Sequence, residues 1–132
     1  MLRALTITVV VAVAATVSGC AGPDTSGPER VAVSFSNAIT NGDGVRACAL
    51  LSPQTAAAVA EASRSACPDA VLHQDLPAAT PLRSVQRYGK QALVRSATDT
   101  MFLSEFPTGW KIIGAGCRPQ GERPYDCGVS KG

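Results

Sequence analysis

Hydrophobic residues follow three patterns along this chain of 132 residues. An apolar run occupies residues 4–17, helical spacing dominates residues 28–66, and runs typical of strands begin after Pro81. A period near 3.6 indicates amphipathic helices, whereas short runs rich in Val, Leu and aromatic residues between turn formers indicate strands. The pattern therefore predicts helices first and a sheet second, which is an α+β arrangement.

Three helices are predicted in the first half of the chain. The first is capped by Ser26, and its apolar stripe consists of Val31, Phe35, Ala38 and Ile39. Asp43 caps a second, short helix that runs to about residue 51, and Ser52-Pro53 opens a third that ends before Pro68. We expect residues 68–81 to be a packed connection without regular structure.

Four strands are predicted after that connection. Residues 84–88 and 91–97 form a hairpin, residues 100–106 the third strand, and residues 110–117 the fourth. Residues 125–129 add at most a short edge strand. The expected fold is an N-terminal helical layer packed on a curved antiparallel sheet of about four strands.

The N-terminal apolar run has the properties of a secretory signal. Arg3 precedes it, small residues end it, and three threonines interrupt it. A membrane-spanning helix needs about 20 apolar residues, and this run is shorter. We therefore expect a cleaved leader rather than an uncleaved anchor.

The leader ends in Val17-Ser18-Gly19-Cys20, which resembles the lipobox of bacterial lipoproteins, with Val17 in place of the usual Leu. The resemblance implies cleavage after residue 19 and a diacylglycerol on Cys20 Sγ. Residues 1–19 are then a signal peptide, residues 20–27 a lipidated cysteine and flexible tether, and residues 28–132 one domain. Two acyl chains suffice for stable anchoring, so we expect the domain on the extracytoplasmic face of the cell membrane.

Charge narrows the choice of partners. The chain has 12 Lys and Arg against 10 Asp and Glu, and loss of the leader removes only Arg3, which leaves a net charge of +1. A nucleic-acid-binding domain usually carries a strongly basic face. Nucleic acid is therefore not an expected partner.

Four cysteines remain besides Cys20: Cys48, Cys67, Cys117 and Cys127. An even number in an exported chain indicates disulfides, with three connectivities open. We favour Cys48–Cys67 and Cys117–Cys127, because each pair lies within one predicted neighbourhood. No CxxC motif occurs and His73 is the only histidine, so a zinc site is not expected.

Catalytic and cofactor motifs are weak. A general acid or base needs a carboxylate in an apolar pocket, and the candidates lie at predicted turns, strand ends or in the connection: Asp69, Asp75, Asp99 and Glu105. The best enzymatic arrangement pairs Glu105 or Asp99 with Tyr88. Gly114-Ala115-Gly116 lacks the third glycine and the helix of a dinucleotide loop, so no cofactor is expected.

The basic residues of the predicted strands, and the large apolar residues of the sheet, can each be interpreted in two ways. Several strands contribute Arg83, Arg87, Arg95 and Lys111, which form either a basic sheet face, suited to lipid headgroups, or scattered solvated charges. Met101, Phe102, Phe106 and Trp110 are expected to be core, and some of them would line any small cavity.

The order of elements in residues 28–117, with a break at Asn41-Gly42-Asp43 and a strand entered through Gly109-Trp110-Lys111, resembles the nuclear transport factor 2-like, or cystatin-like, cone fold. It is similar to small secreted and lipoprotein members from high-GC Gram-positive bacteria. The resemblance implies a cavity between sheet and helices. Its lining would include Phe35, Tyr88, Phe102 and Trp110.

Relatives with this fold include enzymes such as ketosteroid isomerase, ligand binders, and proteins that dimerise or contact partners through the sheet. Fold does not choose among these functions. With an anchor, two disulfides and no assembled catalytic set, we expect a non-enzymatic interaction or ligand-binding module, with an envelope protein or a small apolar ligand as partner. The alternatives are an apolar carrier or enzyme that uses the cavity, and a structural envelope protein.

Overall fold

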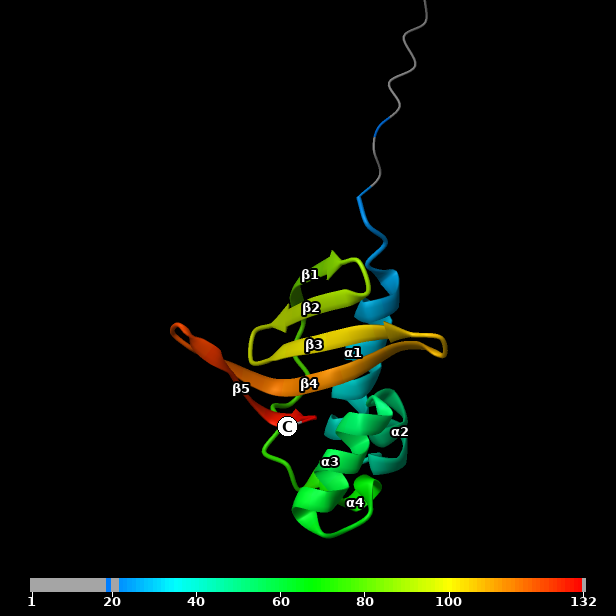
Figure 1. The fold of residues 1–132 in the computed structure, drawn as a ribbon, viewed down its shortest axis with the longest axis vertical. Coiled ribbons are helices and arrows are strands. Elements are labelled where there is room, and N and C mark those ends of the chain that lie inside the picture. The colour runs from blue at the N-terminus through cyan, green and yellow to red at the C-terminus, as the bar shows by residue number, and fades with distance from the viewer. Residues whose placement is uncertain (1–18, 20–21, 132) are drawn as a thin grey trace, which may run out of the picture.

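A computed structural model describes residues 19 and 22–131 of the chain. Helices and an antiparallel sheet form two layers (Figure 1), which confirms the α+β prediction. The helices are α1 (Ser26–Thr40), α2 (Gly44–Leu50), α3 (Pro53–Ser63) and α4 (Cys67–Leu72). The strands are β1 (Leu82–Tyr88), β2 (Gln91–Ser96), β3 (Thr100–Phe106), β4 (Gly109–Gln120) and β5 (Arg123–Ser130).

Side-chain caps begin α2 and α3 as predicted, whereas the predicted Ser26 cap of α1 is wrong. Ser26 is the first residue of that helix, and the preceding Thr25 makes no side-chain cap bond. Asp43 accepts the backbone N–H of Arg46 at 3.0 Å, and Ser52 accepts that of Thr55 at 3.2 Å. The buried Thr55 hydroxyl also lies 3.3 Å from the carbonyl oxygen of Ile113 and donates to it. The start of α3 is thereby joined to the sheet.

The helix α4 corrects the prediction of an irregular connection from residue 68 onward. Pro68 occupies the first turn, where a helix needs no N–H from it, and Asp69 is favourable beside the positive end of the helix dipole. The buried Ala70 and Val71 supply the apolar side. A proline can end one helix or begin the next, and the sequence pattern around Pro68 predicts only the end of α3.

The sheet has five strands in the order β1-β2-β3-β4-β5, one more than predicted. The fifth, β5, pairs with β4 from Gly114↔Ser130 to Gln120↔Arg123. Pro119 falls where the register shifts, and Pro124 lies on an edge strand, so neither missing N–H breaks the ladder. The two prolines made this region look like a loop in the sequence.

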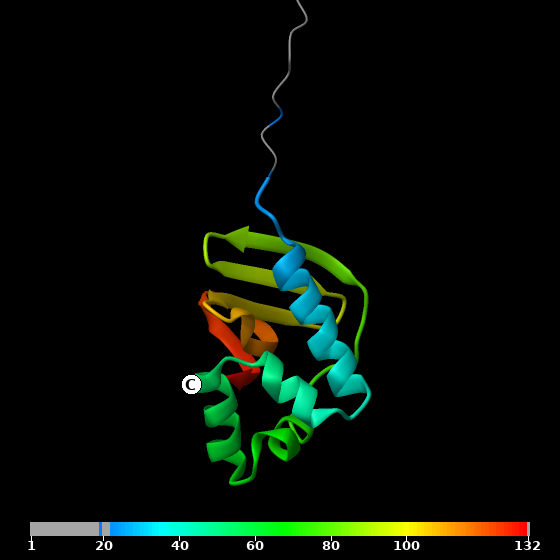
Figure 2. The same ribbon diagram turned by 90° about the vertical axis from the view of Figure 1, so that its right-hand side faces the viewer.

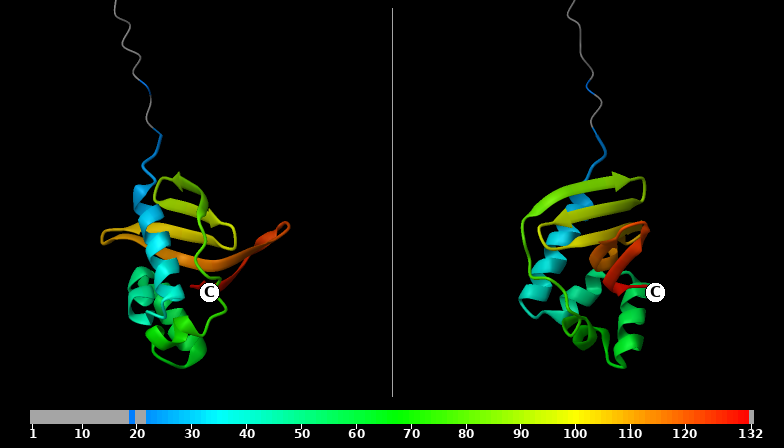
Figure 3. Two further views of the ribbon diagram at one scale, coloured as in Figure 1. Left: turned by 180° about the vertical axis from the view of Figure 1, so that it is seen from behind. Right: turned by 90° about the vertical axis from the view of Figure 1, so that its left-hand side faces the viewer.

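The helix α1 crosses the strands on one face of the sheet, whereas α2, α3 and α4 form a group at the β4–β5 end, in which α4 packs on α2 and α3 (Figures 2 and 3). The core lies between the layers, and its largest buried side chains include Phe35, Val71, Val94, Leu103 and Ile112. Beyond the stretch of β4 that pairs with β5, Leu51 forms a parallel bridge with Ile112, and the Ser52 N–H donates to the Ile112 carbonyl at 2.9 Å. The chain between α2 and α3 therefore covers that part of the β4 edge.

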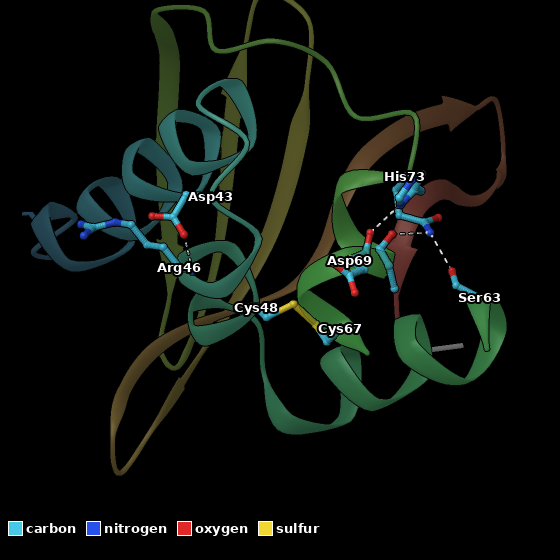
Figure 4. The surroundings of a disulfide bond; sticks show 9 residues. Asp43, Arg46, Cys48, Ser63, Cys67, Asp69 and His73 are labelled. Atoms are coloured by element: carbon cyan, nitrogen blue, oxygen red, sulfur yellow. Dashed lines mark hydrogen bonds between the residues drawn. A yellow bond between two sulfur atoms is a disulfide. The ribbon is translucent and has the colours of Figure 1, made fainter. Parts of the chain in front are cut away.

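Both favoured disulfides are present. Cys48–Cys67 joins α2 to the start of α4 (Figure 4), and Cys117–Cys127 links directly paired residues of β4 and β5. Closing loops of 19 and 10 residues is worth about 3 kcal/mol each in the chain-entropy description. The two disulfides thus stabilise the short helices α2 and α4 and the edge strand β5.

We expect Gly44→Ala to lower the free energy of unfolding by about 1–3 kcal/mol through overpacking. Gly44 is buried, and a Cβ there would overlap the carbonyl oxygen of Pro68, whose position is held by the nearby Cys48–Cys67 disulfide. Urea unfolding of the oxidised protein measures the change. The matched control is Val45→Ala, because Val45 is 70% exposed on the same helix; equal midpoints for the two variants would contradict close α2–α4 packing.

Candidate functional site

The structure does not bring together the four residues expected to line a cavity. Phe35 is buried in the core and Trp110 is half-buried against the same core, whereas Phe102 lies on the face of the sheet turned away from the helices. Tyr88 is 62% exposed. None of the four lines any of five surface pockets formed by residues 22–131.

That outer face of the sheet carries an apolar strip. Ala92, Val94, Met101 and Leu103 are buried towards the helices, so by strand alternation Leu93 and Phe102, which pair across β2 and β3, point outwards. Tyr125 of β5 packs edge-on against Phe102, with ring centroids 5.1 Å apart, and is 36% exposed. We call Leu93, Phe102 and Tyr125 the outer strip.

Polar pairs border the outer strip on both sides. Arg95 donates to Gln86 at 3.0 Å, and Gln91 donates to Ser104 at 2.6 Å. No helix lies over this face, which is turned towards the viewer in Figure 1. An apolar centre with a hydrogen-bonded polar border is the usual composition of a protein–protein contact surface.

Arg87 forms a junction between the start of the domain and the sheet. Its Nη1 donates to the Asp24 carbonyl oxygen at 3.1 Å, its Nε to the Gly89 carbonyl oxygen at 2.9 Å, and its Nη2 to Glu105 Oε2 at 3.1 Å. The guanidinium also lies 5.1 Å from the centre of the Trp110 ring. A planar group with five donors satisfies such a set of contacts, which a lysine would not.

The first turn of α1 packs tightly on this junction. A Cβ on Gly27 would lie 2.6 Å from Trp110 Cδ1 and 2.8 Å from its Nε1, so only glycine fits. The Ser26 N–H donates to Asp24 Oδ1 at 2.9 Å, and this bond, helped by Arg87 and Arg30, lowers the pKa of Asp24. The chain is therefore attached to the sheet from Asp24 onward.

The proposed catalytic partners lie apart from one another. Glu105 is engaged by Arg87 on the helix-facing side, whereas Tyr88, the next residue of β1, points to the other side. Asp99 sits in the β2–β3 turn and accepts the N–H of Cys117 at 3.2 Å. His73 is exposed and bonded to the Asp69 carbonyl oxygen at 2.7 Å (Figure 4).

The basic residues do not share one face either. Arg87 points to the helix layer, Arg95 lies on the outer face, and the Lys111 Nζ reaches back to the Ala49 carbonyl oxygen at 2.8 Å. Arg83 is exposed on the edge strand β1. Strand alternation in the sequence could have identified Arg87 as inward-facing, because it lies two residues after Val85 in β1. A charged side chain in that row needs bonding partners.

One pocket of about 190 Å³ adjoins the Cys117–Cys127 disulfide and is lined by charged side chains, including Asp75, Arg118 and Asp126. Ligand sites are commonly 300–1,000 Å³ and largely apolar. Among the described residues, no group of three or more His, Cys, Asp or Glu is arranged to hold a metal ion. The pocket therefore offers no built binding site.

Comparison with known proteins does not supply a family for the chain. No protein-family model, curated protein or solved structure matches it. Nor does any helix within residues 22–131 have the length and apolar character required to span a bilayer.

We expect the contribution of Asp99 to stability to fall as pH rises. Burial raises the pKa of Asp99 above its ordinary value of 3.8, although the N–H groups of Thr100, Gly116 and Cys117 act in the opposite direction. The folded state then binds this proton more tightly than the unfolded state. Stability from Asp99 is complete below pH 3.8 and is lost as pH passes the raised folded pKa.

The test compares unfolding free energies of the native chain and Asp99→Asn from pH 3 to pH 7, with both disulfides oxidised. Asn keeps an oxygen acceptor for Cys117 but does not titrate. The unfolding free energy of Asp99→Asn should therefore increase relative to that of the native chain as pH rises from about 3.8. A decrease in the unfolding free energy of the variant relative to the native chain over this range would show that the backbone N–H groups affect the pKa of Asp99 more than burial does.

Proposed function

We propose that this protein is a membrane-anchored extracytoplasmic lipoprotein, held by a lipid on Cys20, whose domain is a non-enzymatic interaction module. Support for the anchor comes from the Val17-Ser18-Gly19-Cys20 pattern at the end of the apolar N-terminal run. Two disulfides suit an oxidising compartment outside the cytoplasm.

The outer strip is the observation that supports an interaction module. Leu93, Phe102 and Tyr125 gather on a face that no helix covers, while the charged residues named as catalytic candidates are dispersed. A cone-type fold of the nuclear transport factor 2-like kind fits helices on one face of an open antiparallel sheet, and members of that superfamily contact partners through the sheet. The partner is accordingly an envelope protein bound at the outer strip.

We expect Cys20→Ala to abolish incorporation of a radioactive fatty acid, because no thiol then remains at the lipidation position. The full-length protein, expressed in a bacterial host, is immunoprecipitated and its label counted. Cys48→Ala with Cys67→Ala is the control that removes thiols elsewhere. Unchanged labelling of Cys20→Ala would disprove the anchor.

We expect a photo-cross-linking amino acid at position 102 to give products several-fold more abundant than the same group at position 45. Phe102 is on the outer strip, whereas Val45 is 70% exposed on α2, away from the sheet face. The experiment uses the intact lipoprotein in cells, with products identified by mass spectrometry. Equal yields at both positions, or none at 102, would contradict a contact surface on the outer strip.

A further inference from the structure

The chain between the lipidation position and the folded domain is very short. Four peptide units separate Cys20 from Asp24, and an extended chain spans at most about 14 Å over that number. The headgroup region on one side of a bilayer is roughly 5–8 Å thick. Because Arg87 fixes Asp24 to the sheet, the surface around Asp24 must lie at or very near the headgroups once Cys20 carries lipid.

Three segments surround this point. The tether leaves beside the first turn of α1, the edge strand β1 and the turn between β1 and β2 (Figures 1 and 2). Their exposed cationic and aromatic side chains are Arg30, Arg83, Tyr88 and Lys90. We call these four residues the tether-side surface.

Charge is distributed unevenly between the two ends of the domain. Residues 24–40 and 82–96, which include α1, β1, β2 and the turn between those strands, have five Lys and Arg against two carboxylates, Asp24 and Glu29. Residues 43–76, which include α2, α3 and α4 at the end away from the tether, have four carboxylates against two arginines. An anionic membrane would attract the first end and repel the second.

Tyr88 adds an amphipathic side chain to that cationic end. It is the most exposed aromatic residue among residues 22–131 and lies next to the β1–β2 turn that carries Lys90. Tyrosine favours the headgroup level of a bilayer, where its ring is partly sheltered and its hydroxyl stays hydrated.

We propose that the tether-side surface docks on the anionic headgroups of the membrane that holds the lipid anchor. This inference rests on the proposed lipidation of Cys20. Docking places the β1 edge of the sheet, which is uppermost in Figure 1, against the bilayer, and leaves the α3–α4 turn, at the bottom of that figure, farthest from it. The outer strip then faces sideways and stays open to a partner in the same membrane.

The chain contains its own controls for a footprinting experiment. It has two tyrosines, Tyr88 and Tyr125, and of its lysines Lys90 and Lys131 are both exposed. The lipidated full-length product is placed in detergent or in vesicles of phosphatidylcholine with or without phosphatidylglycerol. Tyrosine iodination and lysine acylation by a membrane-impermeant reagent are then read by mass spectrometry.

We expect labelling of Tyr88 and Lys90 to fall several-fold on transfer from detergent to phosphatidylglycerol vesicles, with less protection in phosphatidylcholine alone. Labelling of Tyr125 and Lys131 should stay constant. Flotation of the vesicles reports anchoring separately. Protein that fails to float overturns the proposed lipoprotein and the docking together, whereas protein that floats with Tyr88 and Lys90 fully reactive overturns the docking alone.

Two double variants test the role of charge position. Arg30→Gln with Arg83→Gln should restore Tyr88 labelling in phosphatidylglycerol vesicles to the level seen in phosphatidylcholine. Arg46→Gln with Arg118→Gln removes the same charge from exposed sites elsewhere and should leave the protection intact. Equal effects of the two would show that net charge, not this surface, governs protection and would refute the proposal.

Discussion

The packing of the helices on one face of the sheet is the interaction on which the remaining structure depends. Phe35 of α1 belongs to the same buried apolar cluster as Leu103 and Ile112 of the sheet, and burial of such side chains stabilises the fold. Because α1 packs on that face and no helix covers the other, the outer face keeps Leu93 and Phe102 partly in contact with solvent. One packing choice thus creates both the core and the proposed contact surface.

Small size explains why the domain uses covalent links as well. The helix α4 has 6 residues and α2 has 7, and helices this short are unstable without tertiary support. Cys48–Cys67 joins the two, while Cys117–Cys127 holds the edge strand β5. Domains with a limited core commonly gain stability in this way outside the cytoplasm.

Arg87 relates the fold to the proposed anchoring. A guanidinium that binds the Asp24 carbonyl, Glu105 and the Trp110 ring leaves little free chain between the domain and the proposed lipidation position, Cys20. The half-exposed ion pair alone contributes at most about 1 kcal/mol, but the set of contacts decides which edge of the sheet lies beside the tether. If Cys20 carries a lipid as proposed, that attachment orients the outer strip relative to the membrane.

The sequence by itself determined the first three helices and the order of the first four strands, because apolar spacing and turn residues act locally. It favoured the two disulfide pairs that form, but three connectivities stayed open until the structure placed the cysteines. Only the tertiary structure decided α4 and the length of β5, since Pro68 and Pro124 are ambiguous until their neighbours are known. The environment of individual side chains was also decided only by the tertiary structure. Whether Phe102 is core or surface, and whether Arg87 is solvated or bonded, depends on which face the helices cover.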